Sequence, residues 1–204
     1  MSVADLRADD LKKLPLRAIV AFGARCARRV EHLAQPPEGH PEAARWTSAI
    51  ARALQLAEDF ARGRADPGTD PDTAVQEVEA CWDLARGELP RENAYAAVVR
   101  ATHAAAAAFH ATRLRGEPEH RRLLSSGPPL DPAHHVADVT TDLAALGAFT
   151  AAVDAADAIS TTDGLTSGAA ADFRRLLDLK LGNYPEPGRP IDPSSDGPLG
   201  PLGS

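Results

Sequence analysis

Residues 14–33 read LPLRAIVAFGARCARRVEHL, and this stretch decides the fold class. Pro15 suits the first turn of a helix. After it, apolar or small residues recur in steps of three, four, three, four and three, at Leu16, Ile19, Gly23, Cys26, Val30 and Leu33. That spacing places them along one face of a helix. The Pro36-Pro37 pair predicts that the helix ends before it.

Five further segments have the same periodicity. They predict helices over residues 41–62, 71–86, 91–115, 132–159 and 169–181. The predicted apolar face of the helix at 41–62 consists of Trp46, Ile50, Ala53, Ala57 and Phe60, and that of the helix at 91–115 consists of Tyr95, Val98, Thr102, Ala105 and Phe109. In the fifth of the six helices the apolar face is expected at Val136, Val139, Leu143, Leu146, Thr150 and Val153. The polar run STTDGLTSG at 160–168 predicts a loop before the last helix, and a short helix is expected over residues 3–13.

Composition supports helices and argues against a sheet. The chain has 41 alanines and 22 leucines but only 10 valines and 4 isoleucines. The run of alanines at 104–108 lacks bulk, which predicts a central helix with close neighbours. We therefore expect an all-α protein: an up-and-down antiparallel bundle of about six helices, with neighbours crossing at about 20°. The bundle domain is predicted over residues 1–181.

A Pro/Gly-rich tail follows, over residues 182–204. It contains six prolines and five glycines, which cannot sustain a regular packed element. We expect it to be extended, mobile or laid across the bundle. Its apolar anchors are Ile191, Leu199 and Leu202.

The charge and the cysteines limit the class of function. A net charge of −7 argues against nucleic-acid binding. Residues 1–64 hold 11 Lys and Arg against 8 Asp and Glu, whereas the remainder is strongly acidic, so the two regions are expected to attract each other. No apolar run is long enough to span a membrane, and a cytoplasmic protein is expected. Cys26 and Cys81 are predicted to be reduced core residues.

Three arginines, Arg25, Arg28 and Arg29, form the first candidate binding group, with Arg17 two turns earlier. The spacing places them on the polar side of the first long helix. They indicate either a solvated face that pairs with the acidic remainder or a contact surface for an acidic protein or anionic ligand.

Two histidines form the second candidate group. His103 and His110 are seven residues apart, so they share a helix face but lie about 10.5 Å apart along its axis. Each could bond to a neighbouring helix, or the two could join ligands from other helices at a metal or acid–base site. Glu117-x-x-His120 and the adjacent His134 and His135 are weaker candidates for metal binding.

Familiar catalytic and nucleotide-binding motifs are absent, including GxGxxG, GxxxxGK[S/T], HExxH, CxxC and GxSxG. No catalytic residue, metal ligand or cofactor is therefore assigned, and binding is favoured over catalysis.

The run at 14–33, AIARALQLAEDFARG at 49–63 and the ending LLDLKLGNYPEPGRPIDPSSDGPLGPL at 176–202 resemble uncharacterised helical proteins common in planctomycetes. Some of these are described as immunity proteins of polymorphic-toxin systems. The resemblance implies a small helical protein that binds another protein, such as a cognate toxin. A metal- or small-ligand-binding bundle using His103 and His110, and a structural homo-oligomer, are the alternatives.

Overall fold

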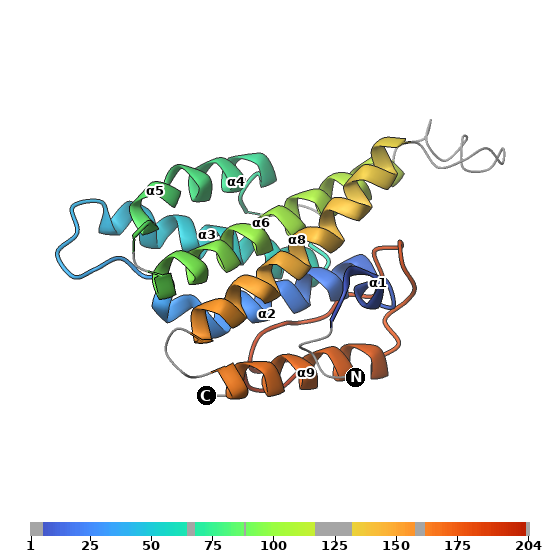
Figure 1. Cartoon of the computed structure of the whole chain (residues 1–204). Helices are drawn as coiled ribbons and strands as arrows, with labels where there is room; N and C mark the ends of the chain where they lie inside the picture. Colours follow the sequence, from blue (N-terminus) through green and yellow to red (C-terminus); the bar gives the residue numbers. More distant parts are fainter. Residues whose placement is uncertain (1–5, 65–67, 88, 117–131, 158–161, 203–204) are drawn as a thin grey trace.

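The computed structural model describes residues 6–64, 68–87, 89–116, 132–157 and 162–202. Within these residues the chain forms eight helices and no strand, which confirms the all-α class (Figure 1). The six longer helices are α2 (Leu16–Ala34), α3 (Ala43–Ala61), α4 (Pro71–Ala80), α6 (Leu89–Gly116), α8 (Pro132–Asp157) and α9 (Thr162–Asp178). The two short ones are α1 (Ala8–Leu11) and α5 (Trp82–Ala85).

Helix α6 lies at the centre, as its alanine content predicts. It packs against α2, α3, α4, α5 and α8. Its predicted stripe is buried at Tyr95, Val98, Thr102 and Ala105. Alanines on both α6 and α8 are buried, so the two helices meet largely through small side chains. This lets their backbones come close together.

The predicted apolar seams of α2 and α3 are confirmed. From Leu16 to Val30 every predicted seam residue of α2 is buried, and so is every one of α3 from Trp46 to Phe60. Gly23 lies where α8 crosses α2, because a Cβ placed on it would be 3.5 Å from the Ala145 Cα. Both cysteines are buried and free, and burial raises the pKa of the Cys26 thiol to about 12. These thiols are core residues.

Two predicted boundaries are wrong. The third predicted helix breaks at Cys81, where the backbone leaves the helical region, and it forms α4 and α5. The predicted loop at 160–168 is helical from Thr162 onward, as the start of α9. Close packing favours glycine at position 168, because a Cβ there would lie 2.9 Å from Nε of Arg29. A polar, glycine-containing run thus forms a helix because it packs against α2.

The prediction of which face of α8 packs inward is wrong. Leu143 is 57% exposed and Thr150 is exposed, whereas Leu146 and Val153 are half-buried. The side that packs inward carries Thr141, Asp142, Ala144, Ala145, Ala148, Phe149 and Ala152. Close approach to α6 and α2 selects the small side chains of α8 for the interior. The predicted side chains of Val136 and Val139 lie outside the part that the structure describes.

The tail is laid across the bundle, one of the three states expected of it. It returns from α9 and runs between α9 and α2 (Figure 1). The N-cap of α2 is Pro15, which offers no capping side chain. Instead, tail carbonyls accept hydrogen bonds from the first two N–H groups of α2, Glu186 from Leu16 and Pro187 from Arg17, each at 3.0 Å.

The apolar anchors attach the tail further along. Ile191 and Leu199 are buried, and Leu202 is partly exposed. The Ile191 N–H donates to the Ala61 carbonyl at the end of α3, at 2.9 Å. The described helices include none that is long and apolar enough to cross a membrane.

Two of the helical glycines, Gly23 and Gly168, give opposite predictions. Gly23→Ala adds a Cβ at ordinary contact distance, so helix propensity should raise the free energy of unfolding by up to about 1 kcal/mol. Gly168→Ala forces the Arg29 guanidinium away from its bonds, so it should lower the free energy of unfolding by about 1 kcal/mol or more. Urea unfolding measures both. Equal effects of the two variants would contradict the packing at Gly168.

Candidate functional site

Arg25 is the most deeply buried of the three predicted arginines. It forms a two-pronged ion pair with Asp172 of α9, in which Nε donates to Oδ2 at 2.7 Å and Nη2 to Oδ1 at 3.0 Å. Both side chains are only 1% exposed. Two parallel hydrogen bonds fix the guanidinium plane as well as its distance. The pair therefore sets how α9 lies on α2.

The remaining donors of Arg25 hold the tail. Nη1 donates to the Pro193 carbonyl and Nη2 to the Gly200 carbonyl, each at 2.9 Å. Arg29 shares Asp172 at 2.6 Å and donates through Nε to the Leu202 carbonyl at 2.8 Å. Two arginines of α2 thus bind both a helix and the tail.

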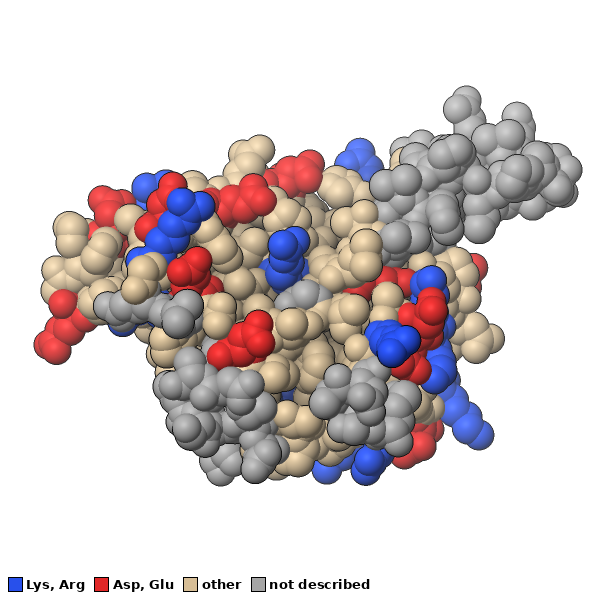
Figure 2. Space-filling view, in the orientation of Figure 1, with Lys and Arg blue, Asp and Glu red and all other residues tan. Residues whose placement is uncertain are grey.

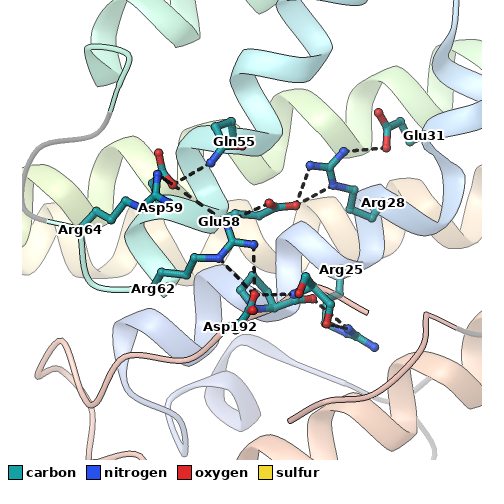
Figure 3. A network of polar contacts seen from close by, with 11 residues as sticks. Arg25, Arg28, Glu31, Gln55, Glu58, Asp59, Arg62, Arg64 and Asp192 are labelled. Atoms are coloured by element: carbon teal, nitrogen blue, oxygen red, sulfur yellow. Dashed lines mark hydrogen bonds and ion pairs between the residues drawn. The ribbon is translucent and has the colours of Figure 1, made fainter. Parts of the chain in front are cut away.

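Arg28 belongs to a less buried part of the polar network that Figure 3 draws around Arg25. Its guanidinium contacts Glu31 at 2.9 Å and Glu58 of α3 at 2.7 Å. Glu58 continues to Arg62 at 3.2 Å, and Arg62 reaches Asp192 of the tail at 3.0 Å. The chain of alternating charges links α2, α3 and the tail.

The predicted arginines therefore all belong to internal contacts. Ser194 of the tail joins the Arg25 and Arg28 parts, because its carbonyl accepts from Arg25 Nη1 at 3.4 Å and its N–H donates to Asp192 Oδ1 at 3.0 Å. Arg25 and Arg29 are buried under the chain's own tail, and Arg28 is partly open to solvent. An acidic partner would reach Arg25 only after the tail had left it. Binding of an outside anion by these three residues stays a prediction. Asp172 was not predicted as a site residue, since nothing in the sequence distinguishes it from other helical aspartates.

The two predicted histidines each bind a carboxylate of α4. His103 Nε2 lies 2.9 Å from Glu79 Oε1, and His110 Nε2 lies 2.9 Å from Asp72 Oδ1. Seven residues forward on α6 correspond to seven residues back on α4, so the two helices run in opposite directions. Each histidine therefore joins α6 to α4 through a side-chain contact. Bonding to a neighbouring helix is one of the two roles expected of them.

His103 and His110 do not converge on one site. In the described ranges no group of three or more His, Cys, Asp or Glu residues is placed to hold a metal ion. Glu117 and His120, and the side chains of His134 and His135, lie outside the described residues.

Helix α8 presents the most exposed large apolar side chain of the described chain. Leu143 is followed along the same face by Leu146, Thr150 and Val153; we call these four residues the α8 stripe. Figure 2 shows uncharged residues over the middle of the molecule, where Figure 1 places α8, with a basic side chain near the centre and an acidic group below it. An apolar helix face of this kind is typical of a protein contact.

His110 also lines a cavity of about 650 Å³. The cavity is bounded by the start of α2, the end of α3, the start of α4 and the end of α6. Its lining includes Arg17 and Arg113, which the sequence did not single out as members of one site. Only packing brings them together, because they lie on different helices.

Comparisons of the chain with protein-family models, with curated proteins and with solved structures give no match.

Removing Arg25 should lower the free energy of unfolding far more than removing Arg28. Arg25→Met leaves Asp172 buried with Arg29 as its remaining charged partner and leaves the tail carbonyls without their donor, so we expect the free energy of unfolding to fall by about 3 kcal/mol. Arg28→Met, the matched control, removes partly solvated pairs and should cost about 1 kcal/mol. Urea unfolding of both variants measures the difference. Similar losses would show that the Arg25–Asp172 pair is not a main support.

Truncation after Leu181 tests the tail. It removes the carbonyls that bind Arg25 and cap α2, together with buried Ile191 and Leu199. We expect the midpoint of thermal unfolding to fall by roughly 10 °C, which corresponds to a few kcal/mol for a chain of this size. An unchanged midpoint in calorimetry would show that the tail does not support the bundle.

Proposed function

We propose that this chain acts by binding another protein, and that the α8 stripe is the contact surface. The observation that carries the proposal is the exposure of Leu143, at 57%, on a helix whose opposite side is closely packed. Leu146 and Val153 extend the apolar face along the helix. A partner that covered them would remove apolar surface from water at roughly 25 cal/mol per Å².

The partner fitted to this surface is a positively charged protein with an apolar ridge. The chain carries a net charge of −7, so long-range attraction would speed encounter with such a partner. A complex of this kind suits a toxin-neutralising immunity protein, the role implied by the planctomycete resemblance. We also propose that the protein is located in the cytoplasm. We propose further that its helices form the up-and-down antiparallel bundle expected from the sequence.

A rigid scaffold favours binding of this type. Helix α8 packs on α6 and α2 through a row of buried small residues, Ala144, Ala145, Ala148 and Ala152. A preformed apolar face loses less conformational entropy on binding than a mobile one. The α8 stripe would therefore bind without prior rearrangement of its helix.

The test compares two leucine variants of the full chain. Leu143→Glu places a charge on the most exposed residue of the α8 stripe, and Leu177→Glu places the same charge at a 38% exposed leucine on α9. Each chain is used to capture proteins from its native cells, captured proteins are identified by mass spectrometry, and the dissociation constant is measured with the purified partner. We expect at least tenfold weaker binding for Leu143→Glu and unchanged binding for Leu177→Glu.

Three outcomes would overturn the proposal. One is a captured protein that binds wild type and Leu143→Glu equally. Another is the absence of any protein that binds the purified chain. The third is concentration-dependent dimerisation that Leu143→Glu abolishes, measured by light scattering, because a second copy would then be the occupant of the stripe.

A further inference from the structure

The cavity beside His110 has the composition of a ligand site that is independent of the α8 stripe. Its volume, about 650 Å³, lies in the range of small-molecule pockets. Four helices supply its walls. Its lining includes Arg17, Phe60, Arg64, Phe109, Thr112 and Arg113.

The charges of this lining do not cancel. Among its anionic groups, Asp72 is bound to His110 and Asp70 caps α4 by accepting from the Thr73 N–H at 3.0 Å. Among its cations, Arg64 pairs with Asp59 at 2.9 Å. Arg113 has no carboxylate partner among the residues that the structure describes. This leaves a positive group on the cavity wall in a protein whose net charge is negative.

Arg17 supplies a second positive group. One of its guanidinium nitrogens, Nη1, donates to the Gly188 carbonyl of the tail, which holds the side chain in place. Its Nε is buried and has no hydrogen-bond partner in the described part of the chain. Burial also lowers the pKa of the Arg17 guanidinium below its ordinary value, which reflects incomplete compensation of its charge.

Thr112 provides a third polar group without a partner. Its Oγ1 is buried and makes no hydrogen bond to any described residue. A buried hydroxyl or guanidinium N–H without a partner costs about 1–3 kcal/mol, and native structures rarely retain one without a reason. Both residues line the same cavity, and rotation of either side chain would turn its unpaired atom towards an acceptor bound there.

An aromatic pair forms the apolar part of the cavity. The rings of Phe60 and Phe109 meet edge to face with their centroids 4.8 Å apart. Phe109 is only partly buried, so its ring is available to a flat apolar group.

We propose that this cavity binds a small organic anion that joins an acidic group, carboxylate or phosphate, to a flat apolar ring. The acidic group would accept hydrogen bonds from the exposed Arg113 guanidinium and, once their side chains rotate towards it, from Arg17 Nε and Thr112 Oγ1. The ring would pack on Phe109. His110 would border the ligand while its imidazole stays bound to Asp72.

The experiment titrates the full chain with phenyl phosphate and with benzoate by calorimetry. Benzyl alcohol, which keeps the ring and lacks the charge, and inorganic phosphate, which keeps the charge and lacks the ring, are the comparison ligands. We expect saturable binding of at least one ring-bearing anion, at least tenfold tighter than of either comparison ligand. The stronger of the two anions identifies the acidic group.

Variants locate the binding. Arg113→Gln removes an exposed charge and should weaken binding at least tenfold, and Arg100→Gln, an exposed arginine of the same helix outside the cavity, should leave it unchanged. Thr112→Val keeps the side-chain shape; it should weaken binding several-fold without lowering the thermal midpoint of the free protein, because the hydroxyl has no partner there. A merely structural role of Thr112 would not produce that combination.

The proposal fails if neither ring-bearing anion binds saturably. It also fails if inorganic phosphate binds as tightly as phenyl phosphate, or if Arg113→Gln and Arg100→Gln weaken binding equally. Because none of these variants touches the α8 stripe, failure here would leave the protein-binding proposal unaffected.

Discussion

The buried ion pair between Arg25 and Asp172 is the interaction on which the arrangement of α2, α9 and the tail depends. A guanidinium taken out of water must satisfy all its donors nearby, since burial without partners costs several kcal/mol. Arg25 does so with one carboxylate of α9 and with carbonyls of the tail. Three segments far apart in the sequence are therefore held by one side chain of α2, and Arg29 reinforces the same junction.

Small side chains impose the other main constraint. Alanines of α6 and α8 allow close contact, and the bulky Leu143 is placed outside as a consequence. The same packing that stabilises the core thus creates the exposed stripe on which the proposed function depends. The cavity beside His110 has a different origin: it lies where the ends of several helices meet and leave Arg17 and Thr112 incompletely bonded.

Most of the helical architecture could be predicted. The seams of α2, α3 and α6 were correct because apolar periodicity is a local property, and it holds wherever a helix is packed on one side. The seam of α8 was misplaced because the rule assumes that the largest apolar residues face inward. The loop predicted at 160–168 was wrong because packing against α2 overrides weak helix propensity. His103 and His110 were found from their spacing, but their carboxylate partners on α4 could not be.

The sequence by itself determined that the chain is helical, where most helices begin and end, and that Cys26 and Cys81 belong to the core. Only the tertiary structure decided that Arg25 meets Asp172, 147 residues away, and that a tail of prolines and glycines lies over both. It also decided which face of α8 is open. The physical reason is range: helix formation depends on neighbours within four residues, whereas the burial of a charge or of an apolar face depends on which distant segment covers it.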